Sequence, residues 1–191
     1  RKTAGLSDER ADRVGRAEHL CPRAASASRS QHGLRRGKVR GMHTVSYPPI
    51  ALSIAGSDPS GGAGIQADLK TFSALQVYGA AAITALTAQN TQGVHAVHEL
   101  PAAFVRAQLD AVLIDLDVRA VKVGMLGRAE IVNAVADALS AHAAAVPMIL
   151  DPVLTAKGGA RLLAEDALHA LRDRLVPRAT LLTPNFPEAA V

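Results

Sequence analysis

Residues 50–72 read IALSIAGSDPSGGAGIQADLKTF, and their order of apolar residues, glycines and apolar residues again indicates the fold class. The stretch begins with the apolar run Ile50–Ala55, which predicts a buried strand. The turn-rich segment Gly56–Gly64 follows and predicts a tight loop, because glycines let the backbone adopt positive φ or approach a ligand closely. A helix is expected after the loop, since apolar residues recur there at helical spacing, at Ile65, Leu69, Phe72 and Leu75.

Strands and helices continue to alternate along the chain. The expected strands are Ile50–Ala55, Ala80–Ala88, Val94–Leu100, Ala120–Val123, Val146–Leu150 and Thr180–Leu182. Tyr78-Gly79 is expected to end the first helix. Pro101 is expected to open a second helix, whose apolar stripe is Phe104, Val105, Leu109, Val112 and Leu116. Further helices are expected at Ala129–Ala141, at Glu165–Leu175 and after Pro184. Nearly continuous apolar strands that alternate with helices predict an α/β fold with a parallel sheet covered on both faces.

In such a sheet, ligands bind beyond the carboxyl ends of the strands. Polar residues or glycines stand at that position after several expected strands, in Gly56–Gly64, Gln89-Asn90-Thr91, Gly124-Met125, Asp151-Pro152 and Thr183-Pro184-Asn185. We therefore expect the functional site at this edge of the sheet.

The net charge of +4 is distributed unevenly. Residues 1–41 hold 11 Lys and Arg against 4 Asp and Glu, whereas residues 42–191 hold 10 against 13. A basic arm can bind nucleic acid or a membrane surface, but this one lacks interleaved aromatics and a periodic apolar face. We expect residues 1–41 to be a disordered leader, with Met42 as a candidate start of the native protein, and we expect neither nucleic acid nor membrane as a partner.

The composition favours a globular protein in the cytoplasm. Apolar residues make up 49% of the chain, which argues against wholesale disorder. No uncharged apolar run reaches the roughly 18 residues that a membrane span requires. The single cysteine, Cys21, cannot form an internal disulfide, and this predicts a reducing compartment.

Two familiar glycine motifs fail in the loop Gly56–Gly64. Gly56–Gly61 matches the first six positions of a Walker A loop, but Gly62 and Ala63 stand where Lys and Ser/Thr are required. The segment that starts at Gly62 fits a relaxed dinucleotide-binding fingerprint. However, no acidic residue lies between Asp68 and Glu99, so none stands at the ribose-binding spacing.

Other catalytic patterns are missing from the sequence. There is no G-x-S-x-G nucleophile motif, and Cys21 lies in the basic leader. His95 and His98 are three residues apart in an expected strand, so they project to opposite faces and do not share a metal easily.

Several motifs in a fixed order resemble those of one known enzyme family. They are Ser53–Phe72, Ile83–Thr91, Lys122–Leu126, Asp151–Val153 and Leu182–Ala189. Together they resemble the hydroxymethylpyrimidine/phosphomethylpyrimidine kinases of thiamine biosynthesis, over roughly residues 49–191. The resemblance implies a three-layer ribokinase-like fold with a mainly parallel central sheet, here over residues 48–191 and incomplete at its C-terminal end. It also implies two ATP-dependent phosphorylations, of 4-amino-5-hydroxymethyl-2-methylpyrimidine and of its monophosphate.

The resemblance implies a pyrimidine site made of Gln89, Asp68, Gly56, Thr87 and Met125. Gln89 is similar to the family residue that pairs with the aminopyrimidine, since its amide offers both a donor and an acceptor. Two structural explanations stand beside these roles. Asp68 could simply favour the dipole of its helix from an early turn, and Met125 could be core filling.

The resemblance places the metal and phosphate end at Asp151, Asn185 and Glu188, with Lys157 reaching the phosphates. Asn185-x-x-Glu188 is similar to the N-x-x-E pattern that holds Mg²⁺ largely through water, which suits an ion that keeps several waters. A helix N-cap with a capping glutamate explains the same pattern. A solvated surface lysine explains Lys157 equally well.

The family's hydroxyl-activating base and anion-binding amides belong to a Gly-x-Gly-Cys or Gly-x-Gly-Asp loop, which does not occur before Val191. The resemblance therefore predicts that the chain by itself does not phosphorylate its substrate. It also implies that the complete enzyme is a homodimer. Two alternatives remain open from the sequence. One is a pyridoxal kinase, and the other is a non-catalytic pyrimidine-binding module with the basic leader as a docking arm.

Overall fold

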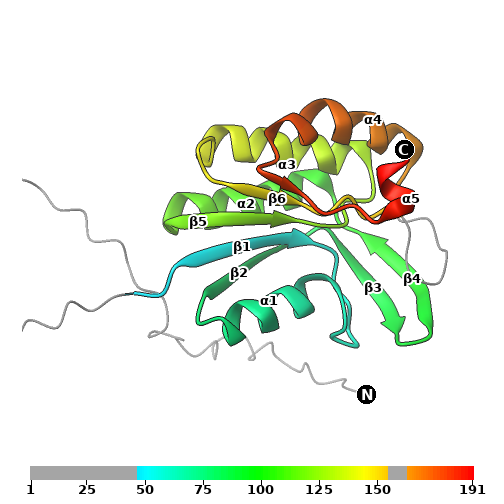
Figure 1. The fold of residues 1–191 in the computed structure, drawn as a ribbon, viewed down its shortest axis with the longest axis horizontal. Coiled ribbons are helices and arrows are strands. Elements are labelled where there is room, and N and C mark those ends of the chain that lie inside the picture. The colour runs from blue at the N-terminus through cyan, green and yellow to red at the C-terminus, as the bar shows by residue number, and fades with distance from the viewer. Residues whose placement is uncertain (1–46, 155–162) are drawn as a thin grey trace, which may run out of the picture.

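The computed structural model describes residues 47–154 and 163–191. The predicted leader at 1–41 and Lys157 lie outside the described residues. A five-stranded sheet forms the centre of the molecule, in the order β2-β1-β5-β6-β7 (Figure 1). Its strands are β1 (Ile50–Ala55), β2 (Tyr78–Ile83), β5 (Val118–Val123), β6 (Met148–Leu150) and β7 (Leu181–Leu182), and every neighbouring pair is parallel.

Helices cover both faces of this sheet. The helices that connect its strands are α1 (Gly64–Ala74), α2 (Ala102–Asp115), α3 (Ala129–His142) and α4 (Glu165–Arg174). The chain moves from β1 to β2 in one direction and from β2 through β5 and β6 to β7 in the other. Right-handed crossovers then require α1 on one face and the other three helices on the opposite face, which is the arrangement seen in Figure 1. The predicted three-layer α/β fold is confirmed.

The core lies between β1, β5, β6 and the face that carries α3. It is built from aliphatic side chains at most 1% exposed, among them Leu52, Ile54, Val121, Val123, Val132, Val135, Leu139 and Leu150. The strands β1 and β6 read as nearly continuous apolar runs because both of their faces are covered.

The predicted strand Ala80–Ala88 is wrong, because the structure divides it at Thr84. Residues up to Ile83 belong to β2, whereas β3 (Ala85–Asn90) leaves the main sheet and pairs antiparallel with β4 (Gly93–Glu99). The Thr84 hydroxyl is buried and donates to the carbonyl of Met125 at 2.7 Å. The hydroxyl therefore has a partner inside the protein, so the chain can bend there without leaving a buried polar group unpaired.

Several smaller predictions also need correction. Tyr78-Gly79 does not end the first helix; α1 ends at Ala74, Gln76 takes a φ of 59°, and Tyr78 begins β2. Phe104 is 58% exposed and does not belong to the buried stripe of α2, whereas Val105 and Leu109 do. The strand expected at Val146–Leu150 is shortened to β6. Within residues 47–154 and 163–191, no helix is long and apolar enough to cross a membrane.

Candidate functional site

The predicted site residues gather at the carboxyl edge of the main sheet. Gly56 follows β1 directly, Met125 lies two residues after β5, and Asp151 follows β6 directly. Asn185 caps the short helix α5 (Phe186–Ala189) just after β7. Since the carboxyl ends of parallel strands meet at one edge of a sheet, residues far apart in sequence become neighbours here.

The glycine loop is organised around the carboxylate of Asp58, which is 2% exposed. One oxygen accepts from the Ser60 amide at 2.9 Å and the Ser60 hydroxyl at 2.7 Å. The other accepts from the amides of Gly62 at 3.0 Å and Ala63 at 2.8 Å. Burial acts to raise the pKa of Asp58, but these hydrogen bonds outweigh it and hold the pKa below its usual value.

This arrangement changes the role expected of the loop. The amides of Gly62 and Ala63, which precede α1, bind the protein's own carboxylate. Gly64 has a φ of +56°, and a side chain there would collide with the carbonyl of Gly56. The glycine at position 64 therefore allows the backbone of the loop to approach the backbone at Gly56 closely. This contact fixes the position of Gly56.

Gly56 in turn packs against Met125. A β-carbon at position 56 would come 2.5 Å from Cε of Met125, so glycine is needed for this contact. The Met125 carbonyl accepts from Thr84, at the point where the chain leaves the main sheet. These contacts bring the loop after β1, the loop after β5 and the bend before β3 together.

Thr87 and Gln89 extend from this junction along β3. The Thr87 hydroxyl donates to the carbonyl of Ser57 at 2.8 Å, and the Thr87 amide donates to the Ser57 hydroxyl at 3.2 Å. The Gln89 side-chain oxygen lies 3.4 Å from the Thr87 hydroxyl. No other hydrogen bond of the Gln89 side chain is found to residues 47–154 or 163–191, so most of its amide remains available to a ligand.

A charged cluster lies beside this junction. Oδ2 of Asp68, on α1, accepts from the Ser53 hydroxyl at 2.6 Å and from Nζ of Lys122 at 3.2 Å. Nζ of Lys122, on β5, also lies 3.6 Å from Oδ2 of Asp151. Lys122 thus contacts both Asp68, which is predicted to bind the pyrimidine, and Asp151, which is predicted to lie at the metal end.

Burial raises the pKa of Asp151 above its usual value. Lys122 acts in the opposite direction, while the negative charges of Glu188 and Asp68 add to the increase. Asp68 and Asp151 thus share one ammonium, and the charge of Glu188 adds to theirs, so the surroundings of Asp151 favour a cation.

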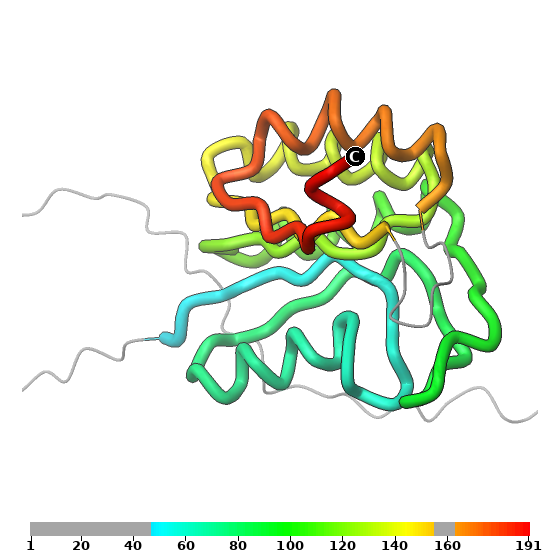
Figure 2. The backbone as a smooth tube through the Cα atoms, turned by 45° about the vertical axis from the view of Figure 1, so that its right-hand side comes forward, coloured from blue at the N-terminus to red at the C-terminus, as the bar shows by residue number. Residues whose placement is uncertain are grey.

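Glu188 and Asn185 form a capping box at α5, as one of the two explanations from the sequence expected. The Glu188 amide donates to Asn185 Oδ1 at 2.9 Å, and the Asn185 amide donates to Glu188 Oε2 at 2.9 Å. Glu188 Oε1 also accepts from the amide of Leu154 at 3.3 Å, which ties α5 to the segment after β6. Figure 2 shows this C-terminal segment, in red, beside the chain that leaves β6.

These residues fit a hydrated magnesium ion better than a directly chelated one. No three acidic, histidine or cysteine side chains within the described ranges are close enough to hold a metal. Each oxygen of Glu188 already accepts one amide but keeps a further lone pair. Mg²⁺ keeps several waters and uses one or two carboxylates, so Asp151 and Glu188 could hold it mostly through water.

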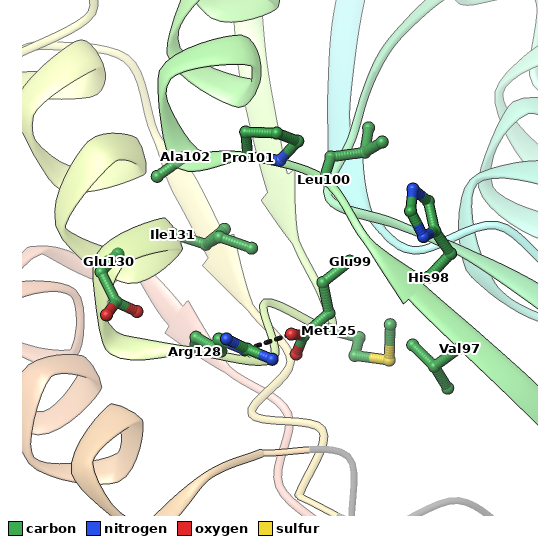
Figure 3. Close-up of a pocket in the computed structure, with 11 residues that line it drawn as sticks. Val97, His98, Glu99, Leu100, Pro101, Ala102, Met125, Arg128, Glu130 and Ile131 are labelled. Carbon is green, nitrogen blue, oxygen red and sulfur yellow. Dashed lines mark ion pairs between the residues drawn. The ribbon is translucent and has the colours of Figure 1, made fainter.

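A pocket of about 760 Å³ lies next to the junction rather than within it. It is lined by the end of β4, the start of α2 and the loop between β5 and α3, and an ion pair between Glu99 and Arg128 crosses it (Figure 3). Among the predicted site residues that the structure describes, only Met125 lines this pocket. The polar side chains converge at the junction, which is therefore the candidate ligand site, and Met125 belongs both to the junction and to the lining of the pocket.

Three residues at this edge were not assigned a role from the sequence. Lys122 lies between the buried residues Val121 and Val123, Ser53 is the one polar residue of β1, and Asp58 is a buried acid in the glycine loop. A polar residue inside a strand that is buried on both faces requires a partner. That signal was present in the sequence and would have pointed to Lys122 and Ser53.

Solved structures that match this chain include small-molecule kinases, and the chain shares their ribokinase-like α/β fold. A phosphomethylpyrimidine kinase from Clostridium difficile 630 is 47% identical, with a TM-score of 0.68, 74% of this chain covered and 61% of that one. A pyridoxal kinase from Staphylococcus aureus, in complex with AMP-PCP and pyridoxal, is 36% identical, with a TM-score of 0.66, 76% of this chain covered and 51% of that one.

The chain belongs to the phosphomethylpyrimidine kinase family, whose model matches residues 58–191. A hydroxymethylpyrimidine/phosphomethylpyrimidine kinase of Rhizobium meliloti (strain 1021) is 58% identical over 142 residues. That match covers 74% of this chain and 53% of the relative. The chain thus spans about half the length of the curated relatives it matches, and the resemblance to this family is confirmed.

Proposed function

We propose that this chain supplies the pyrimidine-binding half of a kinase that phosphorylates 4-amino-5-hydroxymethyl-2-methylpyrimidine, and then its monophosphate, with ATP. The observation that carries the proposal is the convergence of Gly56, Asp68, Gln89 and Met125 at one edge of the sheet in a chain of this family. Phosphoryl transfer is catalysed mostly by positioning and charge neutralisation. These residues would do the positioning.

Each group has a role that matches the substrate's chemistry. An aminopyrimidine presents a ring nitrogen and an amine side by side, and the Gln89 amide can donate to the first and accept from the second. Asp68 provides a further acceptor for the amine. The thioether of Met125 offers a polarisable surface against which the flat ring can pack, and its position is set by Gly56.

At the other end of the site, Asp151, Asn185 and Glu188 would hold Mg²⁺ through water, with Lys157 near the phosphates. The ion would neutralise charge on the transferring phosphates. The negative charges of Glu188 and Asp68 near Asp151 support the binding of a cation there.

A pyridoxal kinase is the second candidate, because solved pyridoxal kinases match the fold at TM-scores near those of the pyrimidine kinase. Pyridoxal has a phenolic hydroxyl and no amine beside its ring nitrogen, so it cannot make the paired contact that Gln89 offers an aminopyrimidine. The higher identity to the pyrimidine enzymes, 47% against 36% in the solved structures, also favours the pyrimidine.

The test is isothermal titration of the chain with the hydroxymethylpyrimidine and, separately, with pyridoxal. It is repeated with the chain joined after Val191 to the remaining C-terminal part of the Rhizobium meliloti relative, which we call the extended chain. We expect binding of the pyrimidine at least tenfold tighter than that of pyridoxal. The opposite preference would assign the chain to the second candidate, and binding of neither by the extended chain would refute the proposal.

We further propose a cytoplasmic homodimer that binds neither nucleic acid nor membrane. The β3–β4 hairpin supports self-association, because Leu86 and Val97 are large apolar side chains left exposed on it. Sedimentation of the extended chain tests the assembly, and a monomer at micromolar concentration would contradict it.

A further inference from the structure

Lys122 is a charged residue in the middle of the main sheet. It lies on β5 between the buried residues Val121 and Val123, and its side chain is 23% exposed. An ammonium in such a place loses much of its hydration and needs partners to offset that loss. Lys122 has two, Asp68 and Asp151, and they belong to the two ends of the proposed site.

The contacts of Asp68 are concentrated on one of its oxygens. Both the Ser53 hydroxyl and Lys122 Nζ donate to Oδ2. Among the described residues, none donates to Oδ1. Two donors on one oxygen fix the rotation of the carboxylate and leave the other oxygen as its free acceptor.

The path of the lysine side chain depends on Gly124. A β-carbon at position 124 would come 3.1 Å from Lys122 Nζ, and equally close to the side chain of Ala55. The ammonium therefore lies over the backbone where β5 ends, close to the step at which the chain turns toward Met125. This position lets one side chain reach both carboxylates.

We propose that Lys122 is a positioning residue: with Ser53 it holds Asp68 so that Oδ1 faces the amine of the pyrimidine, and it links this carboxylate to Asp151 at the metal end. The inference rests on the proposed function, which it deepens. Lys122 acts through Asp68 and does not itself contact the reacting atoms. It also sets the charge of the cluster, since it is the one cation in contact with these carboxylates among the described residues.

Lys122→Met removes the charge and keeps a side chain of similar length. Pyrimidine affinity should fall about tenfold or more, because a charge-assisted hydrogen bond that orients the acceptor is lost. Affinity for Mg²⁺ alone should instead rise several-fold, because the carboxylates lose the cation that offsets their charge. Lys122→Arg keeps the charge and should leave Mg²⁺ affinity unchanged within about twofold. A merely structural role would lower both affinities together.

Two further variants make the experiment decisive, with both ligands titrated into the extended chain. Ser53→Ala removes the other donor to Oδ2 without changing charge, so it should weaken the pyrimidine and leave Mg²⁺ unchanged. Arg119→Met is the control: it removes a cation from the same strand, but Arg119 is 68% exposed and pairs with Asp117. It should alter neither affinity.

The outcomes separate this inference from the proposed function. If the unmodified extended chain does not bind the pyrimidine, the function is wrong, while the Mg²⁺ titration still tests Lys122. Mg²⁺ affinity that is unchanged or lower in Lys122→Met would overturn the inference. So would an unchanged pyrimidine affinity in both Lys122→Met and Ser53→Ala. If Lys122→Met does not fold, Lys122→Gln replaces it, because it also removes the charge and is held to the same two outcomes.

Discussion

Met125 occupies the space that a side chain at Gly56 would fill: a β-carbon there would come 2.5 Å from Met125 Cε. The φ of Gly56 is not in the positive range, so alanine strains no backbone there. The obstructing atom is the end of a flexible side chain and can move. We expect Gly56→Ala to lower the melting temperature by only a few degrees but to weaken pyrimidine binding by about tenfold, because Met125 is displaced from the ring. Calorimetry and titration on the same sample measure both.

The same substitution at two other glycines should have a smaller and a larger effect. A β-carbon at Gly93 would meet no atom within 4 Å, so Gly93→Ala should leave both quantities unchanged. Gly64 combines a φ of +56° with a collision against the Gly56 carbonyl, so Gly64→Ala should be severely destabilising. A Gly56→Ala variant that binds the pyrimidine as tightly as the unmodified chain would remove Met125 from the site.

Gln89→Ala should weaken pyrimidine binding with little effect on stability. The Gln89 side chain makes one long contact, to the Thr87 hydroxyl, so the free protein depends little on it. Losing a paired hydrogen bond to a buried ligand costs on the order of 1–3 kcal/mol, or about 5- to 150-fold in affinity. Gln92→Ala, in the exposed turn of the same hairpin, is the matched control. Equal affinities of the two variants would exclude Gln89 from the site.

Asp58 should make stability depend on pH in the acid range. Its pKa in the folded protein lies below the usual 3.8, so its carboxylate contributes stability that is present above pH 3.8 and is lost as the pH falls through the folded-state pKa. Asp58→Asn places an amide NH₂ against amide donors and should cost roughly 2–4 kcal/mol at pH 7. Denaturant titrations at pH 7 and pH 3 measure this cost, which should shrink in acid. A cost that is the same at both pH values would show that charge is not involved.

The sequence predicted the parallel sheet, because apolar strands alternating with helices are a property of the chain itself. It also placed the candidate site residues after the strands, and the structure brings Gly56, Met125 and Asp151 to one edge of the sheet. The prediction of one strand over Ala80–Ala88 was wrong, because this apolar run is divided at Thr84 between two sheets. That bend depends on the hydroxyl of Thr84 meeting the Met125 carbonyl 41 residues away, which no local pattern reveals. The position of Lys122 between Val121 and Val123 did signal a need for a partner, but its two partners, Asp68 and Asp151, lie on other elements, and no local pattern identifies them.

The charged carboxylate of Asp151 should lower the stability of the fold while it favours the binding of Mg²⁺. Its pKa is raised, so protonation stabilises the fold below pH 3.8 and that contribution is lost as the pH rises through the folded-state pKa. At pH 7 the charged carboxylate is therefore a cost, and Asp151→Asn should raise the melting temperature in the absence of metal. The same variant should weaken Mg²⁺ binding. Lys122 retains Asp68 as a partner, so the cluster remains paired.

A thermal scan with and without Mg²⁺ checks this directly. Mg²⁺ should raise the melting temperature of the unmodified chain more than that of Asp151→Asn, because a ligand stabilises only the form that binds it. Asp173→Asn, on α4 away from this edge, serves as the control. If Mg²⁺ stabilises all three proteins equally, the ion does not bind at Asp151.

We expect the 191-residue chain to bind the pyrimidine but not to phosphorylate it, and the extended chain to do both. The residues at the sheet edge bind and orient, but a transferring phosphoryl group also needs a base for the attacking hydroxyl and donors for its oxygens. A base typically contributes about 10²- to 10⁴-fold and such donors about 10²- to 10³-fold. The family resemblance assigns both to a glycine loop not found in these 191 residues. An ADP-release assay with Mg-ATP on both proteins measures the difference, and equal rates would mean that the groups performing the transfer already lie within this chain.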